Sequence, residues 1–210
     1  MSRSIHIARD SRIYEGLPPH GRGQRIGLYG GSFNPPHIGH RQVALRALRL
    51  LQLDQVWWLV TPGNPLKAPH GLKPLRERLE ATARIASHPR FKVTAIENRW
   101  HIRFTADLVT RLAVREPATR FVWIMGGDNL QNFHLWESWQ EIAASVPIAI
   151  VPRPGSLSAP LAAPAARALA PYRQGNESAA CLADLRAPAF VVLPGPRTPV
   201  SSTALRAASG

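Results

Sequence analysis

One short segment, residues 30–40 (GGSFNPPHIGH), constrains the fold of this chain more than any other. It separates an apolar run at 25–29, which predicts a strand, from residues 41–51, whose apolar side chains recur on one face of a helix. The glycines at its start let backbone N–H groups approach an anion, and the start of a helix adds partial positive charge. Two histidines, His37 and His40, open that helix. The segment therefore predicts a phosphate-binding turn.

Apolar runs and helical patterns alternate along the rest of the chain, which is typical of an α/β protein. Strands are predicted at 25–29, 54–61, 91–95, 121–125, 146–151 and 189–193, and helices at 41–51, 74–87, 105–115, around 133–139 and around 161–170. This alternation predicts a Rossmann-like, doubly wound parallel sheet with flanking helices in a single domain. We assign that domain to residues 25–210 and expect residues 1–24, which are polar, to form a flexible N-terminal extension.

The chain carries a net charge of +13, and arginine predominates among its basic residues. Such a charge favours anionic ligands or nonspecific contact with nucleic acid, although a genomic bias in base composition explains it equally well. No recognition motif for nucleic acid appears, so we expect no such partner. No run approaches the roughly 20 apolar residues that span a bilayer, and no signal peptide is evident. We therefore expect a cytoplasmic protein without a membrane partner, in which the single Cys181 packs as a small hydrophobe.

Polar segments follow several of the predicted strands directly. They are residues 30–40, 62–70, 126–136 and 194–206. Because ligands of doubly wound sheets bind at the carboxyl ends of the strands, we expect these segments to meet at one crevice.

The motif at 30–40 is neither of the common nucleotide-binding loops. It lacks the GxGxxG spacing of dinucleotide-binding folds, and no Lys follows its glycines as in a P-loop. Two histidines at this spacing could bind a metal, but no third ligand is evident nearby. Alternatively, one histidine caps the helix and the other packs against the core. The glycines beside them favour contact with a phosphate, whose charge imidazole N–H groups can stabilise in a transition state.

The segment Gly30–His40 resembles the (H/T)xGH signature of the nucleotidyltransferase superfamily, whose members transfer a nucleoside monophosphate from a triphosphate. Val200–Arg206 (VSSTALR) resembles its second signature, ISSTxxR, with Val in place of Ile. Within the superfamily, residues 25–206 are most similar to the bacterial nicotinate-nucleotide adenylyltransferases.

Shorter segments add to this resemblance. They are Pro65–Lys67 (PLK), Phe104–Asp107 (FTAD), Gly126–Leu130 (GGDNL), Leu135–Trp136 (LW) and Arg153–Gly155 (RPG). The related pantetheine-phosphate adenylyltransferases usually carry Thr at the position of His37 and lack Trp136 and the RPG segment. They are therefore the second candidate family.

The resemblance implies a reaction. The phosphate of nicotinate mononucleotide attacks the α-phosphorus of ATP, and nicotinate adenine dinucleotide and pyrophosphate are formed in NAD biosynthesis. Because the nucleophile arrives ionised, positioning and charge neutralisation can supply the catalysis. Mg²⁺ would arrive bound to ATP, so no metal-binding residues are predicted.

The resemblance also implies which residues act. His37 and His40 are the catalytic pair, with His40 on the α-phosphate and His37 assisting on the phosphates. The implied ATP-binding residues are Gly30, Gly31, Ser32, Phe33, Gly39, His40, Gly126, Asp128, Ser202, Thr203 and Arg206. The implied acceptor-binding residues are Lys67, Thr105 and Trp136.

Some of these residues have structural alternatives. Trp136, implied to stack on the pyridine ring, could belong to the core with Phe133 and Trp139. Asp128, implied to accept a hydrogen bond from a ribose hydroxyl, and Thr105, implied to present its backbone N–H to the nicotinate carboxylate, could instead cap helices. Two alternative functions also remain. One is a sister adenylyltransferase acting on nicotinamide mononucleotide or phosphopantetheine, and the other is a basic nucleic-acid-binding module.

Overall fold

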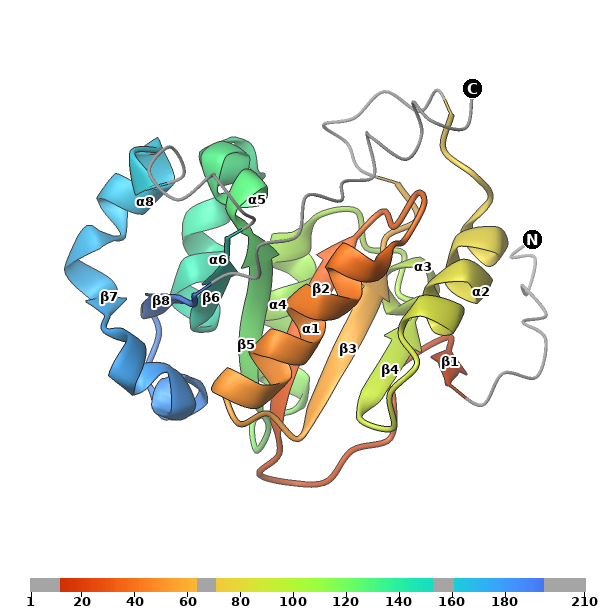
Figure 1. Cartoon of the computed structure of the whole chain (residues 1–210), viewed down its shortest axis with the longest axis horizontal. Helices are drawn as coiled ribbons and strands as arrows, with labels where there is room; N and C mark the ends of the chain where they lie inside the picture. The colour runs from red at the N-terminus through yellow and green to blue at the C-terminus, as the bar shows by residue number, and fades with distance from the viewer. Residues whose placement is uncertain (1–11, 64–70, 153–160, 195–210) are drawn as a thin grey trace.

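The computed structural model describes residues 12–63, 71–152 and 161–194, and these form a single parallel sheet flanked by helices (Figure 1). The strands are β1 (Ile13–Tyr14), β2 (Arg25–Gly31), β3 (Gln55–Val60), β4 (Phe91–Thr94), β5 (Arg120–Gly126), β6 (Ile148–Val151), β7 (Arg173–Gln174) and β8 (Phe190–Val192). Their order in space is β1-β4-β3-β2-β5-β6-β8-β7, and every neighbouring pair is parallel. The chain winds outward in both directions from β2, which confirms the predicted doubly wound α/β fold.

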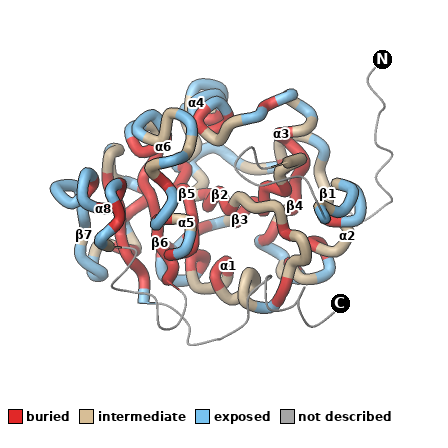
Figure 2. Tube along the Cα trace, turned by 90° about the horizontal axis from the view of Figure 1, so that it is seen from above, coloured by how far each residue is buried: buried red, intermediate tan, exposed pale blue. Residues whose placement is uncertain are grey.

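Helices cover both faces of this sheet. They are α1 (Ile38–Leu50), α2 (Leu75–Ile85), α3 (Ile96–Arg99), α4 (Thr105–Arg115), α5 (Gly127–Asn132), α6 (Trp139–Ser145) and α8 (Pro164–Ala168), with 3-10 helices η1 (Phe133–Leu135), η2 (Ala170–Tyr172) and η3 (Asn176–Asp184). Figure 2 shows the buried strands between α1 on one side and α4 and α6 on the other. None of the helices in the described ranges is long and apolar enough to cross a membrane.

The core consists of two clusters, one on each face of the sheet. Side chains of α1, α2 and η3 pack on the first face, and those of α4, α5, α6 and α8 pack on the second. Successive residues of β3 alternate between the two, so that Trp58 joins the first cluster and Trp57 the second. Both indoles are fully buried. Burial on both faces explains why this strand is apolar without interruption.

Residues 12–24 differ from the flexible extension that we expected. Ile13 and Tyr14 form an edge strand beside β4, and the Thr94 hydroxyl donates a 2.6 Å hydrogen bond to the carbonyl of Gly16. Farther along, the ring of His20 packs edge-on against Trp57 with 5.1 Å between centroids. This part of the chain therefore belongs to the domain. Its two-residue strand is too short to produce a recognisable period in the sequence, and residues 1–11 lie outside the described residues.

The region after β6 is more regular than its proline content suggests. The predicted helix around 161–170 is the short α8, and the predicted last strand is β8, but η3 and β7 were not expected. Asp184 ties η3 to the sheet, because it accepts hydrogen bonds from Arg25 at 2.6 Å and Arg120 at 2.5 Å. Cys181 is exposed rather than packed in the core, contrary to our expectation.

Candidate active site at the carboxyl edge of the sheet

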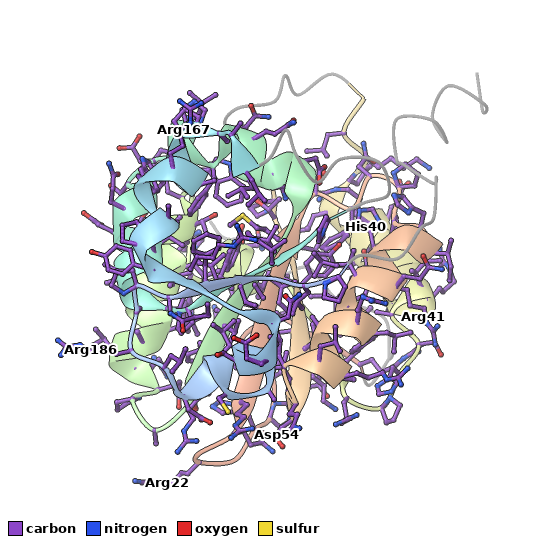
Figure 3. The ribbon with its side chains drawn as sticks, turned by 60° about the vertical axis from the view of Figure 1, so that its left-hand side comes forward. Arg22, His40, Arg41, Asp54, Arg167 and Arg186 are labelled. Carbon is purple, nitrogen blue, oxygen red and sulfur yellow. The ribbon has the colours of Figure 1, made fainter. Side chains whose placement is uncertain are left out.

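The glycine-rich turn follows the central strand β2. At this point the strand order reverses, because β3 and β4 lie on one side of β2 and β5 and β6 lie on the other. β2 ends at Gly31 between its partners β3 and β5, and α1 begins at Ile38. A crevice for ligands forms at such a switch point because the flanking connections diverge to opposite faces. Figure 3 places His40 at this end of α1, whereas Asp54, which precedes β3, lies at the opposite edge.

His37 and His40 cap the start of α1 together. Nδ1 of His37 accepts the backbone N–H of Gly39 at 3.1 Å, and Nδ1 of His40 accepts the backbone N–H of His37 at 3.1 Å. This is a capping box in which imidazoles take the places of the usual Ser and Glu side chains. The alternative in which a histidine caps the helix is therefore observed, and both histidines take part in it.

Capping determines which ring nitrogen of each neutral imidazole carries the proton. A ring nitrogen that accepts an N–H bond carries no hydrogen, so the proton of each neutral ring lies on Nε2. The two rings lie 3.9 Å apart between centroids and are inclined by 40°. His37 is only 4% exposed, whereas His40 is half-buried. The half-buried His40 can thus present an N–H donor to an anion, whereas Nε2 of His37 is buried behind it.

The aromatic ring of Phe33, which belongs to the core, packs against this histidine pair. Its side chain is buried, and its ring packs edge-on against His40 with 5.2 Å between centroids. The same ring contacts Trp58 at 5.2 Å. Its φ angle of 45° lies in the left-handed region, which a bulky residue adopts only when its surroundings hold it there. The backbone at the predicted anion cradle is therefore fixed by packing of the aromatic ring.

A buried arginine that we did not predict joins the turn to the neighbouring loop. Arg78, in α2, is 2% exposed. Its guanidinium donates to four backbone carbonyls, those of Lys73, Ser32, Thr61 and Pro62, at 2.8, 2.8, 2.7 and 3.0 Å. Periodicity could have identified this residue, because it shares the apolar face of α2 with Leu75, Leu79 and Thr82.

Glu97 is the second buried ionisable group that we did not predict. Burial lowers the pKa of Arg78, and the charge of Glu97 opposes that effect. Burial likewise raises the pKa of Glu97 to about 7, against the opposing effects of a hydrogen bond with the side chain of Thr61 and of the charge on Arg78. The sequence of the short helix α3 gave no sign that this carboxyl is buried.

Gly126 and Asp128 lie at the end of β5, beside the turn. Gly126 is the N-cap of α5, and Asp128 is exposed in the first turn. The suggestion that Asp128 is the N-cap is therefore wrong. A carboxylate in the first turn is favourable to the helix dipole and remains accessible to a ligand.

Trp136 and Thr105 come from the helices of the second face. The indole of Trp136 is partly buried, edge-on to Phe133 at 5.5 Å and to Trp123 at 6.3 Å. A methyl group added at Gly30 would lie 2.8 Å from Trp123, so this indole bridges the turn and Trp136. Thr105 is the first residue of α4; Phe104 is the N-cap, so the capping role considered for Thr105 is wrong.

The remaining predicted site residues, Lys67, Ser202, Thr203 and Arg206, lie outside the described residues. Within the described ranges, no three His, Cys, Asp or Glu side chains gather as metal ligands. Parallel pairing of β2 with β5 brings the segments 30–40 and 126–136 together. Arg78 also joins Ser32 to Pro62, the first residue of the segment 62–70, whose residues 64–70 lie outside the described residues.

The raised pKa of Glu97 predicts a change of stability with pH. In the folded chain Glu97 keeps its proton up to about pH 7. In the unfolded chain the pKa of this carboxyl has its ordinary value of 4.5. The contribution of Glu97 to the unfolding free energy is therefore complete below pH 4.5. It is lost, by roughly 3 kcal/mol, as pH rises through the folded-state pKa of about 7. We expect the unfolding free energy of the wild type, minus that of Glu97→Gln, to fall by this amount between about pH 4 and about pH 8.

Urea denaturation across this pH range measures the difference. Glu77→Gln removes an exposed carboxylate from α2 and is the control, for which we expect no comparable fall. A difference between the wild type and Glu97→Gln that does not vary with pH contradicts the prediction.

Comparisons with known proteins agree with this arrangement. Residues 28–208 match the family described as Cytidylyltransferase-like. A protein of Bradyrhizobium sp. (strain ORS 278) named probable nicotinate-nucleotide adenylyltransferase is 54% identical over 186 residues, which cover 89% of this chain and 97% of that protein. A protein of the same name from Rhizobium meliloti (strain 1021) is 52% identical over 183 residues, which cover 87% of this chain and 97% of the relative.

Solved structures show the same fold. The nicotinic acid mononucleotide adenylyltransferase of Plasmodium falciparum, complexed with APC, superposes with a TM-score of 0.64 at 16% identity, covering 88% of this chain and 83% of that one. Its complex with NaAD gives a TM-score of 0.61 with the same identity and coverage. At this identity, the structures support the fold, and the close relatives support the family. The chain belongs to the cytidylyltransferase-like family and, within it, to the nicotinate-nucleotide adenylyltransferases.

Proposed function

We propose that this chain transfers the adenylyl group of ATP to nicotinate mononucleotide, forming nicotinate adenine dinucleotide and pyrophosphate. The observation that carries the proposal is the histidine capping box at the switch point, whose Nδ1 atoms are both occupied by backbone N–H groups. The names of the close relatives support the same reaction. A cytoplasmic location stays a prediction.

The chemistry needs little proton transfer. An ionised phosphate oxygen of the acceptor forms a bond to the α-phosphorus of ATP, and the bond between that phosphorus and the bridging oxygen to the β-phosphate breaks. Pyrophosphate leaves with the bonding electrons. Negative charge grows on the α-phosphate oxygens and on the leaving oxygen as this happens. Fixed N–H donors, which need no reorganisation, stabilise such charge efficiently.

The histidines fit this role through Nε2. We assign the half-buried His40 to the α-phosphate, and the more deeply buried His37 to support of the phosphates from the start of α1. The thirteen residues of α1 add the partial positive charge of a helix N-terminus. Gly30, Gly31, Ser32, Phe33 and Gly39 supply the surrounding backbone.

The other ATP contacts remain proposals on this framework. Gly126 and Asp128 would bind the nucleoside, with the Asp128 carboxylate accepting a hydrogen bond from a ribose hydroxyl. Ser202, Thr203 and Arg206 would bind the β- and γ-phosphates, Arg206 by paired charge-assisted bonds. Mg²⁺ belongs to the substrate as the MgATP complex, where triphosphate oxygens bind it and it offsets their charge.

The acceptor would lie on the β5 side of the turn. We assign Trp136 to stacking on the pyridine ring, Thr105 to its carboxylate through the backbone N–H at the start of α4, and Lys67 to phosphate charge. The partly exposed indole of Trp136 and the position of Thr105 as the first residue of α4 support these two roles.

The first prediction from the proposed function concerns the acceptor substrate. Pyrophosphate release from MgATP is measured with nicotinate mononucleotide, nicotinamide mononucleotide and phosphopantetheine in turn. We expect release with nicotinate mononucleotide and a lower kcat/KM with its amide, since N–H donors favour a carboxylate. Preference for either other acceptor assigns the chain to a sister activity. Absence of release with all three, in a chain that binds nucleic acid, favours the basic binding module.

The second prediction concerns His40. Replacing it by Asn retains a side-chain oxygen that can accept the N–H of His37 but removes Nε2. We expect kcat to fall on the order of 100-fold or more, as for removal of one donor to a developing anion. His88→Asn is the matched control, because His88 caps a turn before β4 at the opposite edge of the sheet. Wild-type turnover by His40→Asn would reduce the capping box to a structural role.

The third prediction concerns Trp136. Aromatic stacking on a base contributes about 1–3 kcal/mol, so Trp136→Ala should raise KM for the acceptor by about tenfold or more. KM for ATP should change little. Steady-state kinetics with each substrate varied in turn separates the two effects. If both KM values rise together with a loss of stability, the ring belongs to the core cluster around Phe133 instead.

A further inference from the structure

Arg78 is a buried cation whose guanidinium donates hydrogen bonds to the backbone of two loops. Its Nη1 atom donates both to Ser32, in the turn after β2, and to Thr61, directly after β3, while Nη2 donates to Pro62. Nε donates to Lys73, just ahead of α2. The guanidinium therefore joins the glycine-rich turn, the loop after β3 and the start of its own helix.

These bonds begin where the sheet hydrogen bonds end. β2 and β3 pair as far as Gly31 and Val60, and the N–H of Thr61 donates to the carbonyl of Gly31 at 3.1 Å. Beyond this point the hydrogen bonds between the two strands no longer hold the segments after β2 and β3 together. Arg78 bridges the carbonyls of Ser32 and Thr61 one step farther on, so it fixes the spacing of the two loops.

One of these bonds orients a peptide plane in the anion cradle. The carbonyl of Ser32 and the N–H of Phe33 belong to one trans peptide, in which the two groups point in opposite directions. Because the carbonyl points to Arg78, the N–H of Phe33 points away from α2. Phe33 also has a φ angle of 45°, which needs a constraint of this kind.

The choice of arginine suits this position. A planar guanidinium presents its donors in a fixed fork, so one side chain reaches several acceptors in defined directions. Lysine carries the same charge on a compact ammonium and cannot reproduce that fork. Burial of the charge is compensated by the four carbonyl dipoles and by attraction to Glu97.

We propose that Arg78 is a positioning residue for adenylyl transfer: it holds the Ser32–Phe33 peptide and the loop after β3 in the geometry that the transition state requires. This inference rests on the proposed function. In the proposed reaction Arg78 contacts neither substrate and acts through the backbone that it holds in place. A displacement of about 1 Å at such a site can lower the rate on the order of 100-fold.

The test compares Arg78→Lys with Arg76→Lys. Arg76 lies two residues earlier in α2 and forms an exposed pair with Glu80, so its replacement is the control. For each protein, kcat and both KM values are measured with MgATP and nicotinate mononucleotide, below the temperature at which unfolding begins. The dissociation constant of a non-hydrolysable ATP analogue is measured by calorimetry.

We expect Arg78→Lys to lower kcat on the order of 100-fold. The two KM values and the affinity for the analogue should change much less, and Arg76→Lys should behave as the wild type. Wild-type kcat in folded Arg78→Lys, even with lower stability, overturns the proposal, because it reduces the arginine to a packing role. Equal loss of kcat and of analogue affinity also overturns it, because it shows a general loss of the nucleotide site.

Failure of the proposed function is distinguishable, since the wild type itself would then release no pyrophosphate with this acceptor. If Arg78→Lys does not fold, Arg78→Gln is assayed with and without guanidinium ion at a low, non-denaturing concentration. Recovery of kcat with guanidinium but not with ammonium supports the proposal, and absence of recovery overturns it.

Discussion

Parallel pairing of β2 with β3 on one side and β5 on the other is the interaction on which the rest of the structure depends. All three strands are apolar on both faces, so helices must cover both faces. Because the strands are parallel, each connection runs back along one face of the sheet to the edge at which the next strand starts. Every strand therefore ends at the same edge. The turn from 30 to 40 and the start of α5 meet there because of this pairing.

The start of α1 shows how a structural need and a chemical one are met by the same side chains. A helix N-terminus has unsatisfied N–H groups, which Ser and Glu usually cap with oxygens. Here His37 and His40 cap it through Nδ1, and each ring retains a second nitrogen whose proton position is then determined. A capping oxygen would satisfy the helix equally well, but it would not hold an N–H donor at a fixed place beside a helix dipole.

Two ionisable side chains behind this turn, those of Arg78 and Glu97, are buried. Arg78 and Glu97 lie beneath the loops that leave β2 and β3, where the regular sheet hydrogen bonds stop. A buried charge without partners is costly, and the four carbonyl acceptors of Arg78 offset that cost only if the loops keep their positions. The cation thus makes loop geometry and folding stability depend on each other, which suits a site that must be formed before its ligand arrives.

The amino-acid sequence alone predicted the class of fold, the principal strands and helices, and the histidine motif, because these follow from side-chain periods and short spacings within continuous segments. It also indicated the family through two motifs far apart in the chain. The three-dimensional structure was needed to show that Ile13 and Tyr14 pair at the edge of the sheet, that Gly126 rather than Asp128 caps α5, and that Arg78 joins two loops. The edge strand and the hydrogen bonds of Arg78 depend on contacts between residues distant in sequence, which leave no local period. The cap of α5 depends on where β5 ends, and β5 pairs with β6 as far as Gly126. The periodicity of α2 placed Arg78 on an apolar face, but the carbonyls that hold it there were set by the pairing of β2 with β3.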